Sequence, residues 1–180
     1  KSIDNSRVKN LIFTSSVAVY GLNKNNPSEE NEKDPFNHYG KSKLKAEEII
    51  EKWYEESSKN KSITIIRPTV IFGERNRGNV YNLFNQIISG KFLMIGNGEN
   101  KKSMAYVGNI VELLKHFTNN PIPGFHIFNY SDKPDLSMKE LIDLIRIKSG
   151  LSISKFSIPI WLGMLVGYFF DFLSFVLIKK

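Results

Sequence analysis

Short apolar segments alternate with longer helical patterns along the 180-residue chain, and this alternation limits the folds that it can adopt. Residues 8–14 and 62–67 are apolar and rich in β-branched residues, which is typical of strands buried on both faces of a parallel sheet. Between them, residues 38–56 carry apolar side chains at helical spacing. Because parallel strands need a crossover connection, usually a helix, this order predicts an α/β fold with a parallel sheet in the first half of the chain.

Shorter elements are predicted in the second half of the chain. A helix is expected over residues 80–88, and Asn109 is expected to cap a helix that runs to Phe117. Ser137 is expected to cap the following helix, whose apolar face would carry Leu141, Leu144 and Ile145. Further strands are predicted over residues 91–95, 103–107 and 125–129.

Charge and composition disfavour several classes of function. The net charge of +7 suits an anionic ligand, but the basic residues form no run flanked by aromatic residues, so nucleic-acid binding is disfavoured. The chain has no cysteine, which rules out a disulfide scaffold and a cysteine nucleophile and agrees with a cytoplasmic protein. His38, His116 and His126 lack carboxylates at ligand spacing, so no metal is expected.

Residues 158–178 form a strongly apolar segment that is long enough to cross a bilayer. Pro159, Gly163 and Asp171 weaken this interpretation, because one Asp at depth costs about 2.5–3.5 kcal/mol. The favoured interpretation is a helix that packs on a neighbouring lobe or on another part of the protein. Contact with a membrane surface is the second interpretation, and a true span is the third.

Tyr39 and Lys43 are four residues apart, so they lie one turn apart on the same face of the predicted helix. A phenol normally holds its proton until about pH 10, and a fixed ammonium nearby favours the phenolate. Ser16 follows the first predicted strand, at the end of the strand where open α/β sheets bind ligands. Together these groups could take a proton from an alcohol or return it to a carbonyl, which is chemistry that needs a hydride acceptor.

Four segments in this order resemble motifs of the NAD-dependent sugar-nucleotide epimerase/dehydratase family, a branch of the extended short-chain dehydrogenases/reductases. They are residues 13–21, which contain Ser-Ser-x-x-Val-Tyr-Gly, the Tyr39-x-x-x-Lys43 pair, residues 67–73 and residues 96–109. The resemblance runs from Val8 to about Lys148. It implies an incomplete Rossmann-like parallel sheet, made of the later strands, and a small C-terminal α/β substrate-binding lobe.

The resemblance also implies how the chain is divided. Residues 1–75 correspond to the later part of the Rossmann-like NAD(P)-binding domain and residues 158–180 to an apolar C-terminal helix. Residues 76–157 correspond to the substrate-binding lobe, which is expected to mix with the Rossmann core in space. The family's Gly-x-x-Gly-x-x-Gly turn, which seats the dinucleotide pyrophosphate, is absent from this sequence. We therefore expect an N-terminally truncated enzyme that is inactive as these 180 residues alone.

Site residues follow from the resemblance position by position. Tyr39 corresponds to the acid/base, Lys43 to the group that favours its phenolate and holds the nicotinamide ribose, and Ser16 to the hydroxyl of the relay at the substrate. The implied cofactor is NAD, with NADP as the alternative, and its further contacts would be Thr14, Ser15, Pro68 and Val70. Besides Ser16, the implied substrate contacts are Asn79 and Lys102, near the phosphates of a nucleotide sugar. Lys102 keeps the charge of the family's arginine but not its bidentate fork.

Two absences narrow the reaction within this family. Enzymes that dehydrate the sugar resemble one another in an Asp-Glu pair after the serine, where this chain has Val17 and Ala18. Epimerisation at C3 and C5 often uses an added cysteine, and there is none. We therefore expect 4-epimerisation through a transient 4-ketone, in the supply of polysaccharide precursors, by a protein that the resemblance implies is a homodimer. The alternatives are a ketoreductase of the same family and a non-catalytic binding or membrane-associated module.

Overall fold

The computed structural model describes residues 8–22, 26–56, 61–152 and 157–178, which fall into two compact units. The first unit contains the described residues of Lys1–Arg75 and Ser103–Lys133. The second contains those of Asn76–Lys102 and Pro134–Lys180. Residues 103–133, which lie within the range expected for the substrate-binding lobe, fold with the first unit because they contribute a strand to its sheet.

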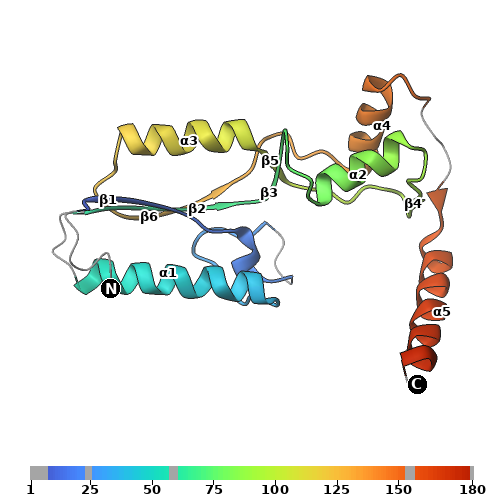
Figure 1. Ribbon diagram of the computed structural model, residues 1–180, viewed down its shortest axis with the longest axis horizontal. Helices are drawn as coiled ribbons and strands as arrows, with labels where there is room; N and C mark the ends of the chain where they lie inside the picture. The colour runs from blue at the N-terminus through green and yellow to red at the C-terminus, as the bar shows by residue number, and fades with distance from the viewer. Residues whose placement is uncertain (1–7, 23–25, 57–60, 153–156, 179–180) are drawn as a thin grey trace. The chain divides into compact units, whose positions relative to one another are not determined.

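The first unit is built on a sheet of three parallel strands, shown edge-on in Figure 1. The strands are β1 (Asn10–Thr14), β2 (Ser62–Pro68) and β6 (Gly124–Tyr130), in the order β1-β2-β6. Strand β2 pairs with β1 from Ser62 to Ile66 and with β6 along its whole length. The α/β class and the parallel pairing predicted from the sequence are therefore confirmed.

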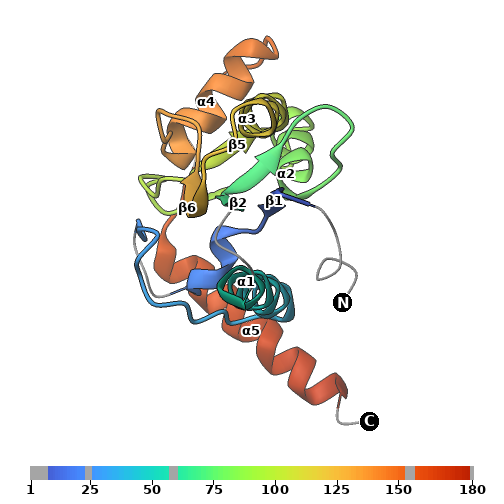
Figure 2. The same cartoon turned by 90° about the vertical axis from the view of Figure 1, so that its left-hand side faces the viewer.

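Two helices cover opposite faces of this sheet, α1 (His38–Glu56) on one face and α3 (Val107–Asn119) on the other (Figure 2). Toward α1, Ile63 and Ile65 of β2 are fully buried against Trp53. Toward α3, the ring of Phe128 stacks on that of Phe117 with the ring centroids 5.4 Å apart. Because both faces of β2 are covered, every residue of the strand is buried, including the polar Ser62 and Thr64.

The first unit also contains three short elements. The 3₁₀-helix η1 (Val17–Tyr20) follows β1, and β3 (Val70–Phe72) pairs in parallel with β5 (Met104–Tyr106). Helix α3 begins at Val107, so the expectation that Asn109 caps it is wrong. The amide of Asn109 instead donates to the carboxylate of Asp132 at 3.0 Å, and the same carboxylate accepts from the backbone N–H of Tyr106.

The second unit contains the remaining elements: α2 (Asn79–Ile88), β4 (Met94–Ile95), α4 (Met138–Lys148), β7 (Ser157–Ile158) and α5 (Ile160–Ile178). The predicted cap at Ser137 is confirmed, since Ser137 and Glu140 form a reciprocal capping box at the start of α4. Of the three residues predicted to form its apolar face, Leu141 and Ile145 are buried together with Ile142, whereas Leu144 is 44% exposed.

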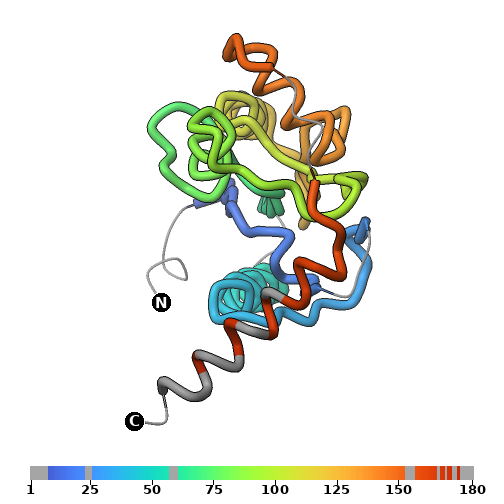
Figure 3. The backbone as a smooth tube through the Cα atoms, turned by 90° about the vertical axis from the view of Figure 1, so that its right-hand side faces the viewer, coloured from blue at the N-terminus to red at the C-terminus, as the bar shows by residue number. Residues whose placement is uncertain are grey.

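The described residues of helix α5 lie in the red part of the tube in Figure 3. Its first turns lie close to β4, since a Cβ added to Gly163 would approach Ile95 Cγ2 to 2.8 Å. Among the side chains of α5 that the structure describes, Trp161 is 63% exposed and Tyr168 is 65% exposed. Among the helices that the structure describes, none combines the length and hydropathy needed to cross a membrane.

Candidate active site

A cavity of about 520 Å³ lies in the first unit where β1 and β2 end. Its lining comes from the end of β1, from η1, from the start of α1 and from the segment that follows β2. It brings together seven residues that the sequence singles out: Thr14, Ser15, Ser16, Tyr39, Lys43, Pro68 and Val70. The carboxyl ends of parallel strands are where open α/β sheets bind their ligands.

The serine pair marks the point where the chain leaves the sheet. The backbone N–H of Ser15 donates to the carbonyl of Ile66 at 2.7 Å, which extends the β1–β2 pairing by one residue. Ser16 then caps η1, because its hydroxyl oxygen accepts from the backbone N–H of Ala18 at 3.2 Å. This contact uses one acceptor position of the hydroxyl and leaves the Ser16 O–H as a donor toward a ligand.

A close contact between α1 and η1 places Tyr39 and Lys43 beside the serine pair. Asn37 caps α1, since its side-chain oxygen accepts from the N–H of Gly40 at 2.8 Å. Gly40 is buried, and a Cβ at this position would lie 2.6 Å from the carbonyl oxygen of Ala18. Only a glycine allows the helix to start this close to η1.

Lys43 is held at the end of β1. Its Nζ donates to the carbonyl oxygen of Thr14 at 2.9 Å, 5.2 Å from the ring centroid of Phe13 and 5.8 Å from that of Tyr39. The Tyr39 side chain is 54% exposed, so its phenol is accessible to a bound molecule. The ammonium is therefore fixed beside an accessible phenol, which is the arrangement that the four-residue spacing predicts.

Two buried hydroxyls also belong to the cavity lining. Ser15 Oγ and Thr69 Oγ1 are buried and have no hydrogen-bond partner within the described residues. Buried polar atoms are normally paired, so these two oxygens leave hydrogen-bonding capacity at the cavity lining. A carboxamide such as that of nicotinamide carries both donors and an acceptor and so fits the pair chemically.

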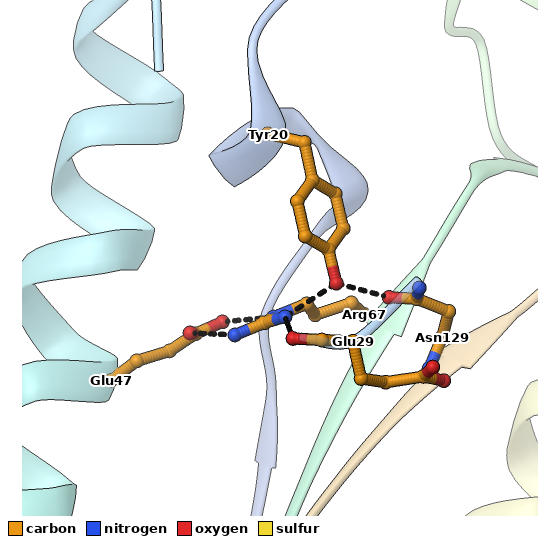
Figure 4. A network of polar contacts seen from close by, with 5 residues as sticks. All are labelled: Tyr20, Glu29, Glu47, Arg67 and Asn129. Atoms are coloured by element: carbon orange, nitrogen blue, oxygen red, sulfur yellow. Dashed lines mark hydrogen bonds and ion pairs between the residues drawn. The ribbon is translucent and has the colours of Figure 1, made fainter. Parts of the chain in front are cut away.

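Sequence reasoning missed a buried ion pair behind this cavity. The fully buried guanidinium of Arg67 donates to both carboxylate oxygens of Glu47, at 2.9 and 2.6 Å (Figure 4). Burial alone would lower the pKa of Arg67, but the hydrogen bonds and charge of Glu47, together with Tyr20, raise it above its ordinary value. The signal in the sequence was one charged residue at the end of an apolar strand.

The same guanidinium connects further parts of the first unit, as Figure 4 shows. It donates to the hydroxyl of Tyr20 in η1 and, at 3.3 Å, to the backbone carbonyl of Glu29. The Tyr20 hydroxyl donates in turn to the side-chain oxygen of Asn129 in β6 at 2.9 Å. One buried group therefore joins α1, η1, β2 and the loop at Glu29.

The remaining two predicted residues, Asn79 and Lys102, lie in the second unit. Asn79 is exposed at the first position of α2. Lys102 is half-buried, and its backbone N–H donates to the carbonyl of Leu136 at 3.1 Å. Over the described parts of the chain, no group of three or more His, Asp or Glu side chains is arranged to hold a metal ion.

Comparison with known proteins supplies a family context for this geometry. Residues 1–130 match the profile of the "NAD dependent epimerase/dehydratase family". The chain is 56% identical over 179 residues to the N-acetyl-alpha-D-glucosaminyl-diphospho-ditrans,octacis-undecaprenol 4-epimerase of Escherichia coli O157:H7, covering 99% of this chain and 54% of that protein. It is 30% identical over 175 residues to the UDP-glucose 4-epimerase of Vibrio cholerae, covering 94% of this chain and 52% of the relative. The chain thus spans about half the length of the curated relatives it matches.

Solved structures show the same fold. The UDP-glucuronic acid 4-epimerase of Bacillus cereus in complex with NAD superposes with a TM-score of 0.74 at 21% identity, over 87% of this chain and 52% of that chain. This likeness supports the Rossmann-like interpretation of the sheet formed by β1, β2 and β6.

Proposed function

Because this chain belongs to the NAD dependent epimerase/dehydratase family, we propose that it supplies the acid/base side of a 4-epimerase acting on a diphosphate-linked sugar. The observation that carries the proposal is the fixed ammonium of Lys43, bound to Thr14 O at 2.9 Å and facing the accessible Tyr39 in one cavity with Ser16. The two curated relatives with the alignments given above are both named 4-epimerases, which supports the same reaction.

In this proposal the residues of the cavity move and hold protons. The Tyr39 phenolate accepts the proton of the sugar C4 hydroxyl and later returns it to the C4 oxygen after the opposite face of C4 is presented. The ammonium of Lys43 lies beside the Tyr39 ring and would stabilise negative charge that develops at the reacting oxygens, and the Ser16 hydroxyl donates to the C4 oxygen. NAD, when bound, supplies a hydride acceptor that also returns the hydride, so no net oxidation occurs.

The cavity residues fit the nicotinamide end of that cofactor. Lys43 would contact its ribose, and the buried hydroxyls of Ser15 and Thr69 would contact its carboxamide. The other proposed neighbours are Thr14, Pro68 and Val70. A ketoreductase of the same family would use the same residues, but it would consume NADH in proportion to product.

The carrier of the sugar has two candidate chemistries that share a diphosphate. The relative at 56% identity is named for a polyprenyl diphosphate sugar, and the relative at 30% for a UDP-sugar. For either carrier we propose Asn79 and Lys102 as the diphosphate contacts, Lys102 through its charge. The exposed apolar side chains of α5 favour the lipid carrier, because they provide a surface that lipid could cover.

We therefore propose that α5 contacts a membrane surface in a protein that works on the cytoplasmic side and forms a homodimer. The net charge of +7 would add attraction to anionic lipid. Replacing Trp161 and Tyr168 by Glu should abolish cosedimentation with phosphatidylglycerol vesicles. The matched control is Ile147→Glu on α4, a residue of similar exposure at 58%. Equal vesicle binding by both variants would contradict the proposal, and sedimentation velocity would report the dimer.

The reaction itself is tested with the protein expressed from its complete coding sequence. UDP-N-acetylglucosamine and polyprenyl-diphospho-N-acetylglucosamine are offered separately, and the C4 epimer and NADH are measured. We expect one of the two to be epimerised without net NADH change. Tyr39→Phe should lower kcat by about 10²–10⁴-fold, as for removal of a general acid/base. Tyr81→Phe, which alters an exposed tyrosine of α2, is the control. Equal kcat values for the two variants would rule out Tyr39 as the acid/base, and a wild-type protein that epimerises neither substrate would favour the non-catalytic alternative.

A further inference from the structure

The apolar pattern of β2 is broken at one position that faces α1. Side chains alternate between the two faces of a strand, so Ile63, Ile65 and Arg67 share one face. Ile63 and Ile65 pack against Trp53 of α1, as an apolar strand should. Arg67 is fully buried on that face and meets Glu47 of α1 there. A charge therefore stands where an apolar side chain could have completed the packing.

We propose that Arg67 is a positioning residue that sets the place of α1, and with it Lys43 and Tyr39, at the end of β1. This proposal rests on the proposed function of the cavity. Glu47 is one turn beyond Lys43 on α1. The helix is thus bound to the sheet at two successive turns, by Lys43 to Thr14 O and by Glu47 to Arg67.

The contacts of Arg67 lead to several of the segments that line the cavity. Pro68, the next residue, belongs to the lining. Tyr20, which accepts from the guanidinium, ends η1, and η1 begins at the cap formed by Ser16. Asn129 lies opposite Arg67 in the register of β2 and β6, and its side-chain oxygen accepts a hydrogen bond from the Tyr20 hydroxyl. The network therefore connects the end of β2, η1 and α1 through directed hydrogen bonds.

The same residues also bind the loop that leads to α1. The carbonyl of Glu29 accepts from Arg67, and its carboxylate accepts from the backbone N–H of Asn129 at 2.7 Å. The side-chain amide of Asn129 donates to the carbonyl of Pro27 at 2.9 Å. This loop continues to Phe36, which lines the cavity.

The Arg67–Glu47 ion pair makes the contact between β2 and α1 directional. Burial of apolar area is non-directional, whereas a bidentate guanidinium–carboxylate pair has a defined geometry. A buried ion pair is often no more stabilising than apolar residues of equal volume. The contribution of the Arg67–Glu47 pair would then be to fix the orientation of α1. This orientation matters because small displacements of the reacting groups lower the rate by large factors.

The test separates orientation from stability in the protein expressed from its complete coding sequence. Arg67→Met removes one charge, and Arg67→Met combined with Glu47→Leu removes both while keeping apolar volume. Arg67→Lys keeps the charge without the fork. The matched control is Thr64→Val, because Thr64 is equally buried on β2 but on the face away from α1. Thermal unfolding, kcat, KM and the acetylation rate of Lys43 relative to exposed Lys45 are measured.

We expect the double variant to unfold near the wild-type temperature. Its kcat should still be lower by about 10²-fold with a nearly unchanged KM. Acetylation of Lys43 relative to Lys45 should rise several-fold, and Thr64→Val should match the wild type in kcat, KM and acetylation ratio. Arg67→Lys should fold and lose part of kcat.

The proposal would be overturned if the double variant had both the stability and the kcat of the wild type. It would also be overturned if the acetylation ratio of Lys43 to Lys45 were unchanged. If the wild-type protein epimerises no sugar, the proposed function fails, and the acetylation ratio still decides the positioning role. If the charge variants do not fold, Tyr20→Phe carries the test, because it removes only the hydroxyl that joins Arg67 to Asn129. A Tyr20→Phe protein with wild-type kcat and acetylation ratio would equally overturn the proposal.

Discussion

The Nζ of Lys43 donates to the backbone carbonyl of Thr14 at 2.9 Å, so the helix that carries Tyr39 is attached to the last residue of β1. A carbonyl acceptor leaves the charge of the ammonium uncompensated, in contrast to a carboxylate partner. The positive charge therefore remains available to the phenol of Tyr39 and to a bound ligand.

Lys43→Met should lower kcat by about 10²-fold or more, because it removes the positive charge that is fixed beside Tyr39. Thermal stability should fall only slightly, and kinetics at several pH values would show the effect. Lys45→Met is the control, since Lys45 is exposed and forms only an i,i+3 pair with Glu48. A Lys43→Met protein with the activity of Lys45→Met would contradict the assignment.

Gly40→Ala should destabilise the first unit and reduce activity, because its Cβ would lie 2.6 Å from the carbonyl oxygen of Ala18. Either α1 or η1 must move, and Tyr39 moves with α1. The matched change Gly167→Ala in α5 meets no atom within 4 Å and should stabilise by about 0.5–1 kcal/mol. Urea unfolding of both variants checks the opposite signs, and a shared sign would refute the close-contact argument.

Glu47→Leu alone should destabilise the protein by about 3–5 kcal/mol, because it leaves the buried guanidinium of Arg67 without its carboxylate. Glu48→Leu, which removes an exposed carboxylate on the same helix, should change the free energy of unfolding by less than about 1 kcal/mol. Denaturant unfolding measures both values. Similar losses in the two variants would show that the buried pair has no special role in stability.

Asp132 should contribute to the loss of stability in acid. Burial raises its pKa, but hydrogen bonds from the Tyr106 N–H, Asn109 and Tyr130 outweigh burial and hold it below the ordinary 3.8. A lowered pKa in the folded state means that the stabilisation is present above the unfolded pKa. It is lost as the pH falls from about 4 through the folded pKa.

Asp132→Asn should therefore flatten the fall in stability below about pH 4 relative to the wild type. Thermal unfolding between about pH 2 and 7 would measure it. Asp143→Asn, on helix α4, serves as the control and should leave the acid limb unchanged. An identical acid limb in Asp132→Asn and wild type would rule out this carboxylate as a contributor.

Local pattern was sufficient for much of the fold and for the membership of the candidate site. Helix α1 has the predicted bounds, 38–56, because its apolar residues recur at helical spacing. The resemblance of short motifs selected seven residues that the structure gathers in one cavity. Their roles as catalytic and cofactor contacts remain predictions, tested by the variants at Tyr39, Lys43 and Arg67.

Tertiary contacts decided the rest, since they join residues that are distant in the sequence. Asn109 looked like a helix cap, but the carboxylate of Asp132 on a later segment holds its amide. Leu144 has the spacing of a buried residue, yet the side of α4 that is buried in the second unit leaves it exposed. Neither the contact of Asn109 nor the exposure of Leu144 could be inferred from periodicity. Periodicity shows which residues share a helix face, but it does not show what packs against that face.

The sequence by itself determined an α/β chain with Tyr39 and Lys43 on one helical face and Ser16 at a strand end, because strand and helix periods are local properties. Only the tertiary structure decided what fixes that helix in place. The parallel register that sets Arg67 opposite Asn129 also brings Arg67 to Glu47, and such a register depends on the packing of the whole sheet.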